Sequence, residues 1–311
     1  MKIIEPFFEF IDVPDPLKKI EICGRVCYKS ESKITADSAE TFVKNLIRSG
    51  HESVLEHAIY IVLCDDADAG TFNRICNTIE RRNGGRVLLK STQKRRNVIS
   101  GNVRAWRDFM RECEALRAYP KFLTLFSGVL FDDVNPRQYW KPTRACFIDI
   151  ADLLTEERDA HFTETVRFVV DRGISHEIVR HRTASFSQES TRYCNYGGGI
   201  TFIKPPFFDD VTRYIWETEM QNVEYAYNLL ISKGAKPQEA RAVLPNSTKT
   251  EIIMTATRDV WKHFFELRTA AGAHPQMKQI AIPLCEEMNR RWENVISGST
   301  TQTVISPAAK R

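Results

Sequence analysis

The sequence predicts a mixed α/β (α+β) protein in which helices surround a sheet, and two observations support this class. Residues 165–170, TVRFVV, alternate as a strand does, whereas 211–234 has the 3.6-residue apolar period of an amphipathic helix. Of the 311 residues, 42% are hydrophobic, and this proportion is enough to bury a substantial core.

A short helix is expected directly after the first of these segments. Asp-Arg-Gly interrupts the strand, and Ser175 is a suitable N-cap for the helix HEIVRHR. Arg180 and His181 would then lie in its last turn. The following GGGITFIKP predicts a glycine hinge and a return strand.

Three more helices and a strand are expected towards the C-terminus. The helix over 211–234 ends at Gly234, a suitable C′ residue, and KPQEARAVLP begins with proline in its first turn and stops at Pro245. Residues 248–257 suit a strand, Asp259 can cap the helix VWKHFFELRTA, and HPQMKQIAIPLCEEMNRRW forms the last helix.

Composition and charge exclude several classes of protein. The 44 basic and 40 acidic residues leave a net charge of +4, too small to indicate a nucleic-acid or membrane partner. No run of 18 apolar residues occurs, and Glu5, Glu9 and Asp12 interrupt the start, so we expect a cytoplasmic protein. The eight cysteines form no C-x-x-C pair, which favours reduced thiols and no metal site.

The stretch RHRTASFSQESTRY (180–193) concentrates three arginines and three serines. The guanidinium fork of arginine matches a phosphate or carboxylate, and Ser190 and Arg192, two residues apart, would face the same side of an extended segment. The pattern indicates a small phosphate-binding cradle. On composition alone, a solvated basic loop is an equal alternative.

The spacing R-H-R, seven residues, then S-x-R-Y resembles the signature of the flavin-dependent thymidylate synthases. Three other segments are similar to elements of that family and occur in the family's order: GHESVLEHAIY (50–60), EARAVLPNSTKT (239–250) and HFFELRTAAGAHPQ (263–276). The resemblance implies a central, mostly antiparallel sheet flanked by helices. It divides the chain into a catalytic core, 1–64 and 165–311, and a large helical insertion, 65–164.

The resemblance also implies an activity: reductive methylation of dUMP to dTMP, with methylenetetrahydrofolate as carbon donor and FAD reduced by NADPH. It implies a homotetramer with active sites between subunits. The residues carried over for FAD are His51, Ser53, Glu56, Arg180, His181, Arg182, Gln188, Thr257, Asp259 and His263. Those carried over for dUMP are Glu177, Arg180, Gln188, Glu189, Ser190, Arg192, Arg241 and Arg268.

Arg268 is the expected catalytic group. Carbon 5 of uracil is a poor nucleophile, and a cation held against the pyrimidine edge stabilises the anion that makes this carbon reactive. The alternative is a cysteine thiolate that adds to carbon 6, for which Cys194 would be the candidate. We favour Arg268, because the family uses no enzyme nucleophile and a lone cysteine is more often a small buried apolar group.

Two departures from the family pattern affect the predicted site. The family commonly has N-x-R where this chain has Thr257-Arg258-Asp259, and SGNVRAWRDFM (100–110), with Asn102 and Arg104, resembles that pattern inside the insertion. The insertion could supply these flavin contacts, or the likeness could be ordinary helix capping, which we prefer. Glu177 replaces an expected glutamine, and we expect it to pair with Arg180 or to bind a sugar hydroxyl.

A second basic run, RRNGGRVLLKSTQKRR (81–96), supports an alternative class of function. It has seven basic residues and no acidic one, so it could bind a nucleic-acid backbone. It contains no aromatic residue for base stacking, and we therefore do not expect a nucleic-acid partner. A catalytically inactive nucleotide-binding protein of the same fold is the other alternative.

Overall fold

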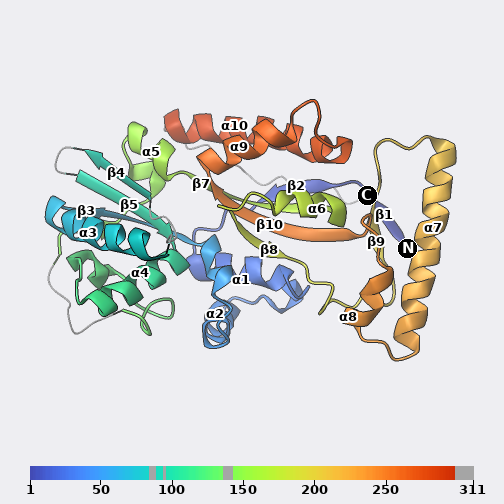
Figure 1. Ribbon diagram of the computed structural model, residues 1–311, viewed down its shortest axis with the longest axis horizontal. Coiled ribbons are helices and arrows are strands. Elements are labelled where there is room, and N and C mark those ends of the chain that lie inside the picture. Colours follow the sequence, from blue (N-terminus) through green and yellow to red (C-terminus); the bar gives the residue numbers. More distant parts are fainter. Residues whose placement is uncertain (84–88, 94–95, 136–142, 298–311) are drawn as a thin grey trace.

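The computed structural model describes residues 1–83, 89–93, 96–135 and 143–297, with two four-stranded sheets and one two-stranded sheet (Figure 1). The strands are β1 (Lys2–Ile4), β2 (Phe7–Phe10), β3 (Ile59–Cys64), β4 (Leu89–Gln93), β5 (Arg96–Asn102), β6 (Cys146–Phe147), β7 (Thr163–Asp171), β8 (Ser185–Gln188), β9 (Thr201–Ile203) and β10 (Lys249–Thr257).

The α-helices are α1 (Pro16–Val26), α2 (Ser38–Arg48), α3 (Asp66–Asn83), α4 (Val103–Leu116), α5 (Thr155–His161), α6 (Arg172–Ile178), α7 (Asp210–Ser232), α8 (Pro237–Ala240), α9 (Arg258–Arg268) and α10 (Pro275–Ser297). The described residues also form the 3-10 helices η1 (Glu31–Lys33), η2 (Glu52–His57), η3 (Lys121–Leu125), η5 (Ile150–Asp152) and η6 (Arg241–Val243).

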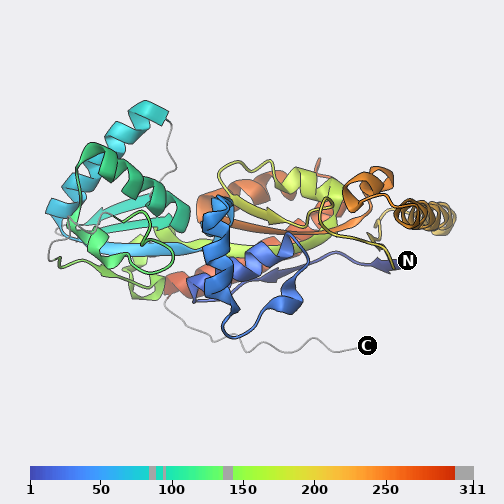
Figure 2. The same ribbon diagram turned by 90° about the horizontal axis from the view of Figure 1, so that it is seen from below.

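The central sheet has the order β2-β7-β10-β8, and all its pairings are antiparallel. Because side chains alternate along a strand, Ile252 and Met254 of β10 pack with α9 and α10, whereas Ile253 and Thr255 face α1 and η2. Helices α9 and α10 cover one face of this sheet, and α1 and α2 lie below the other (Figures 1 and 2). Antiparallel sheets flanked by helices confirm the predicted fold class.

The second sheet has the order β4-β5-β3-β6 and carries α3 and α4. Its core is aromatic, with Trp106 and Phe126 at a ring-centroid distance of 4.8 Å. Strand β3 belongs to the predicted core segment 1–64, yet it pairs with strands of the segment 65–164, which contains helices as expected and three strands as well. The division of the chain into core and insertion stays a prediction.

Most elements expected in the second half are present: β7, β9, α7, α8, β10 and α10. Gly234 has φ +92° just after α7, which explains the glycine at this position. Pro237 occupies the first turn of α8, and Pro283 lies inside α10.

Two expected helix starts were wrong. Helix α6 begins a turn earlier than predicted, because the side chain of Asp171 accepts the Ile174 N–H (2.9 Å) and is the N-cap instead of Ser175. Arg180 and His181 consequently follow the helix and do not lie in its last turn. Thr257, not Asp259, is at the N-cap position of α9.

Two buried histidines lie beside the sheets. His57 Nδ1 is 2.8 Å from Thr255 Oγ1, and its Nε2 is 2.9 Å from Ser187 Oγ. His161 Nδ1 is 2.7 Å from Ser100 Oγ. Burial lowers the pKa of His57 to about 3 and that of His161 to about 4. Both rings are therefore neutral in the folded protein at neutral pH.

We expect this neutrality to make the fold sensitive to acid. The unfolded chain takes up protons on both histidines below about pH 6.5, but the folded protein does not do so until its much lower pKa values are reached, so stability falls with pH in that window. The melting temperature should drop between about pH 7 and pH 5. His57→Gln should lower the melting temperature at neutral pH and flatten this dependence, and an unchanged pH dependence in the variant would contradict the assignment.

Candidate functional site

The Arg-His-Arg segment forms the turn between α6 and β8. The Ala184 N–H donates to the His181 carbonyl at 3.0 Å, which turns the chain back into the central sheet. Arg180 and Arg182 are exposed, whereas His181 is buried. Within the described ranges, neither arginine forms an ion pair, so both guanidinium groups are available to an anion.

Arg268, at the end of α9, reaches back to this turn. Its Nη1 lies 2.6 Å from Glu177 Oε2, its Nη2 donates to the Glu177 carbonyl at 2.9 Å, and its Nε donates to His181 Nε2 at 3.2 Å. The expectation that Glu177 pairs with Arg180 is therefore wrong, because the end of α9 brings Arg268 closer to this carboxylate. Three of the five guanidinium N–H groups are engaged, and two remain for a ligand.

His181 is held in its neutral form by this arrangement. Burial, then the positive Arg268 and the nearby His263, lower the pKa of His181 to about 4. Because Nε2 accepts from Arg268, the proton of the neutral ring resides on Nδ1. The exposed His263 lies at the edge of the cluster, with a ring-centroid distance of 5.8 Å to His181.

At the other end of β8, the side chains of Gln188 and Glu189, both carried over for dUMP, bond to other residues of the protein. The side-chain amide of Gln188 donates to Ser175 Oγ at 2.8 Å. Glu189 is buried and accepts hydrogen bonds from Tyr196 (2.6 Å) and Lys249 (3.0 Å). Its carboxylate thus supports the strand end, and a direct contact of Glu189 with dUMP stays a prediction.

Ser190, Arg192 and Arg241 come together just beyond β8. The Arg192 N–H donates to Ser190 Oγ at 3.3 Å, and Arg241 Nη1 donates to Thr191 Oγ1 at 3.4 Å. Arg192 and Arg241 are exposed, and in the described part of the chain no carboxylate pairs with either. This group has the donors that a phosphate requires.

Two tyrosines lie beside this group: Tyr193, the last residue of the S-x-R-Y pattern, and Tyr28, which the sequence analysis did not single out. The rings of Tyr28 and Tyr193 lie 5.1 Å apart between centroids, and Tyr193 is 57% exposed. The guanidinium carbon of Arg192 is 5.5 Å from the Tyr193 ring centroid. No spacing links Tyr28 to a segment 165 residues away, but exposed aromatic rings beside unpaired cations suit a planar base with a phosphate.

Residues of the H-E-x-x-x-E-H segment lie on the opposite face of the central sheet. Glu56 Oε2 accepts from Ser185 Oγ (2.9 Å), and Glu56 Oε1 accepts from Arg104 Nη1 (3.0 Å). Side chains alternate along β8, so Ser185 faces η2 whereas Phe186 and Gln188 face α6 and α9. His51 and Ser53, both exposed, belong to the η2 side.

The start of α9 is remote from its end. Thr257 and Asp259 are separated from Arg268 by the length of the helix, roughly 15 Å at 1.5 Å per residue. Asp259 is exposed and lies 3.6 Å from Lys262. The structure therefore does not bring Thr257 and Asp259 into the Glu177–His181–Arg268 cluster.

Asn102 in the segment 100–110 caps its helix, because its side chain accepts the Ala105 N–H at 2.8 Å. This observation supports the preferred capping interpretation for Asn102. Arg104, in contrast, contacts Glu56, one of the residues carried over for FAD.

Cys194 is not poised as a nucleophile. The residue is buried, and burial, followed by the negative Glu189, raises the pKa of its thiol to about 11. A protonated thiol at neutral pH supports a mechanism without a cysteine adduct. Among the described residues, no cysteine is disulfide-bonded and no cluster of three metal-ligating side chains occurs.

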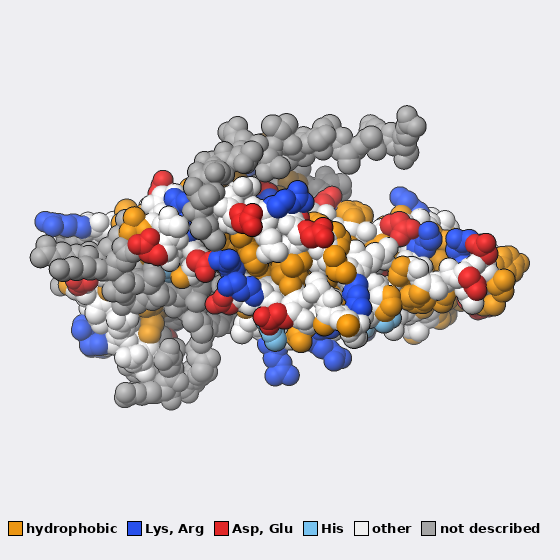
Figure 3. All heavy atoms as spheres, turned by 90° about the horizontal axis from the view of Figure 1, so that it is seen from above, with side chains coloured by type: hydrophobic (Ala, Val, Ile, Leu, Met, Phe, Trp, Pro, Cys, Tyr) orange, Lys and Arg blue, Asp and Glu red, His pale blue; other side chains and the backbone are white. Residues whose placement is uncertain are grey.

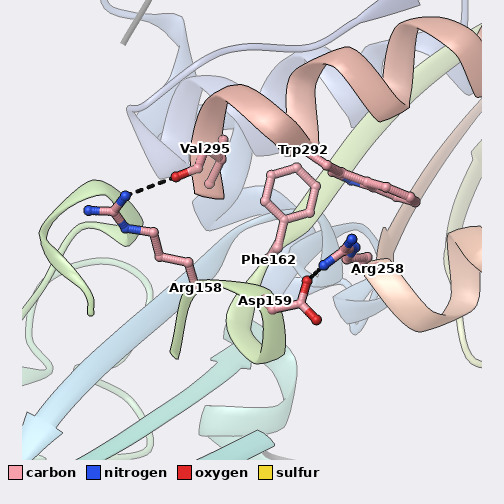
Figure 4. Close-up of a pocket in the computed structure, with 6 residues that line it drawn as sticks. All are labelled: Arg158, Asp159, Phe162, Arg258, Trp292 and Val295. Carbon is pink, nitrogen blue, oxygen red and sulfur yellow. Dashed lines mark hydrogen bonds and ion pairs between the residues drawn. The ribbon is translucent and has the colours of Figure 1, made fainter. Parts of the chain in front are cut away.

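A narrow pocket, too small to admit a water molecule, lies where α5, α9 and α10 meet (Figure 4). Its lining includes the ion pair of Asp159 with Arg258, and Arg158 Nη1 donates to the Val295 carbonyl at 2.9 Å. None of the residues carried over for FAD or dUMP lines it. We regard it as a packing gap between helices.

The nucleic-acid alternative was based on the basic run 81–96. The side chains of the basic run 81–96 lie outside the described part of the structure. On the face shown in Figure 3, basic and acidic side chains are interspersed. No described helix is long and apolar enough to cross a bilayer.

The sequence model of the thymidylate synthase complementing protein family matches residues 9–77 and 160–292. A flavin-dependent thymidylate synthase of Geobacter sulfurreducens is 36% identical over 118 residues, which are 37% of this chain and 51% of the relative. One from Pyrococcus furiosus is 34% identical over 125 residues, 39% of this chain and 51% of the relative. The chain thus aligns with about half the length of these relatives.

A UMP/dUMP methylase, PolB of Streptomyces cacaoi, whose structure holds 5-Br dUMP, overlaps 96% of this chain and 97% of its own, with 17% identity and a TM-score of 0.39. This likeness is too low to support an argument about the site. The family match covers more than half of the sequence and confirms the resemblance of the motif segment. The chain therefore belongs to the thymidylate synthase complementing protein family.

Proposed function

We propose that this protein is a flavin-dependent thymidylate synthase that methylates dUMP to dTMP with methylenetetrahydrofolate, and that NADPH reduces its FAD. The observation that carries the proposal is the group of exposed, unpaired cations Arg192 and Arg241 beside Ser190, next to the Tyr28–Tyr193 rings. A nucleoside monophosphate presents the matching features, one dianionic phosphate and one planar base.

The residues of this chain also suit FAD. Arg180 and Arg182 are exposed cations without carboxylate partners in the described ranges, and a neutral His181 offers Nδ1–H as a donor. FAD, when bound, would supply the hydride that completes the methyl group. His51, Ser53 and Glu56 lie on the opposite face of the sheet, so they would contact the flavin of another subunit.

Assembly from several subunits is thus part of the proposal, with the homotetramer of the family as the expected form. Helix α7 supports self-association, because Val211, Tyr214 and Tyr225 are each about 70% exposed. Hydrophobic side chains are visible at the end of the molecule that α7 forms (Figure 3). A cytoplasmic location and a preference for NADPH stay predictions.

Arg268 is assigned the role of activating the pyrimidine. Glu177 and His181 fix its guanidinium group from two directions and leave two N–H groups for a ligand. A cation held in this way requires no reorganisation when negative charge develops on the ring. Because His181 is neutral, it does not compete with Arg268 for this charge.

The protein as purified provides the first test. An absorption spectrum of oxidised flavin, or its appearance on adding FAD to colourless protein, supports the enzyme. A protein that binds dUMP but refuses FAD would instead be an inactive nucleotide-binding relative, and one that binds only nucleic acid would contradict both.

We expect Arg192→Ala to weaken dUMP binding and to leave flavin bound. Loss of one charge-assisted contact costs about 1.5 to 3 kcal/mol, roughly a ten- to hundredfold change in affinity. Isothermal titration with dUMP and the flavin absorbance of the same sample measure both properties. Loss of flavin with unchanged dUMP affinity would move Arg192 to the cofactor site.

Arg268→Lys should reduce turnover far more than dUMP affinity. The ammonium is a point charge and cannot reproduce the guanidinium fork, so kcat should fall about a hundredfold, as for loss of a positioned donor. Flavin reduction by NADPH, followed in a stopped-flow instrument, should stay near the wild-type rate because it does not need an activated pyrimidine. If both rates fall together, Arg268 holds the flavin or the fold.

A further inference from the structure

The two four-stranded sheets have the same strand arrangement. The orders β8-β10-β7-β2 and β4-β5-β3-β6 correspond position by position, and every pairing in both is antiparallel. The connections correspond as well, since β7-α6-β8-β10-α9 in one half matches β3-α3-β4-β5-α4 in the other.

Side chains at matching positions make matching contacts. Trp261 Nε1 donates to the Glu164 carbonyl of β7 (3.4 Å), and Trp106 Nε1 donates to the Tyr60 carbonyl of β3 (3.3 Å). The spacing is also the same. Ala256 pairs with Glu164 and lies five residues before Trp261, and Gly101 pairs with Tyr60 and lies five residues before Trp106.

The starts of the two halves also match in sequence. FIDVPDPL (10–17) and FIDIADLL (147–154) are identical at five of eight positions. The Ile11 N–H donates to the Thr165 carbonyl of β7 (2.9 Å), and the Ile148 N–H donates to the Ile61 carbonyl of β3 (3.1 Å). The likeness therefore extends to individual backbone hydrogen bonds.

The two halves exchange elements. Strand β2 begins the first half but pairs with β7 of the second, and β6 begins the second half but pairs with β3 of the first. Likewise, His57 before β3 bonds Thr255 in β10, and His161 before β7 bonds Ser100 in β5. Reciprocal contacts of this kind are those of two copies related by a twofold axis.

The two halves differ in the residues that could bind an anion. Residues 189–248, which include Ser190, Arg192 and Arg241, separate β8 from β10, whereas β4 and β5 are two residues apart. At the position of Arg268 the first half has Cys113. It thus lacks the counterparts of the proposed dUMP-binding group and of the activating cation.

We propose that residues 7–135 and 146–297 are two copies of one module fused in a single chain, in which the first copy is a built-in partner and contributes Arg104 as a positioning residue for the site of the second. The assay of Arg104 rests on the function proposed above. The duplication itself rests on the geometry and on the sequence likeness, without any assay.

Arg104 acts through Glu56. It starts from α4 of the first copy and pairs with one oxygen of Glu56, while the other oxygen accepts from Ser185, the first residue of β8 and three residues after Arg182. Without Arg104, the half-buried Glu56 carboxylate would lose its cationic partner. We expect its hydrogen bond with Ser185 to weaken as a result, so that the Arg-His-Arg turn is less firmly positioned.

Fluorescence titration of the apo-protein with FAD tests the role of Arg104. Arg104→Met should weaken FAD binding by about tenfold, equivalent to one lost contact to a charged group. Arg111→Met is the matched control, because Arg111 lies on the same helix and pairs with Glu52, and it should bind as the wild type does. The double variant Glu56→Gln, Arg104→Met should bind no more weakly than the weaker single variant, since the two residues act together.

Wild-type affinity in Arg104→Met, or additive losses in the double variant, would overturn the positioning role.

Thermal unfolding tests the fused pair without any ligand. Ser100→Ala removes the hydroxyl that bonds His161 in the other copy, and Thr255→Ala removes the one that bonds His57. Each variant should unfold in a single transition at a lower melting temperature than the wild type. Two separate transitions would overturn the module pairing, and a wild type that binds no FAD would refute the proposed function alone.

Discussion

The pairing of β10 with β7 on one side and β8 on the other positions α9, which ends at Arg268, and β8, which lies between the Arg-His-Arg turn and Ser190. Nine residues of β10 pair with β7, and four pair with β8, so the strand has no freedom to shift. A shift by one residue would move Thr255 away from His57 and would bring apolar side chains to the wrong face. This register determines where α9 begins, directly after β10. It also fixes the position of β8, and the candidate cations lie on both sides of β8.

The alternation of side chains along β8 places the residues carried over for FAD on two faces of the sheet. Arg268, His181 and His263 gather on the α9 side, whereas Glu56 faces Ser185 on the η2 side. In the function that we propose, the built-in first copy and further copies of the chain supply groups to the site.

Much of the fold could be predicted from the sequence, because the strand over 165–170 and the helix over 211–234 have clear periods. The cap of α6 was missed since Asp171 and Ser175 are both good N-cap residues, and only the backbone path decides between them. The Glu177–Arg268 pair and the Tyr28–Tyr193 contact join residues that are far apart in the chain. Local patterns carry no information about such contacts, and the duplication is similarly hidden where its two copies have diverged.

Tritium release from dUMP labelled at carbon 5 distinguishes activation of the pyrimidine by Arg268 from activation by a cysteine adduct. Substitution at this carbon must release its hydrogen, so release reports the chemistry and not only binding. We predict release that requires FAD, NADPH and methylenetetrahydrofolate together and that persists in Cys194→Ser. Release that proceeds without flavin and disappears in Cys194→Ser would contradict this prediction, because a cysteine adduct would then activate the pyrimidine.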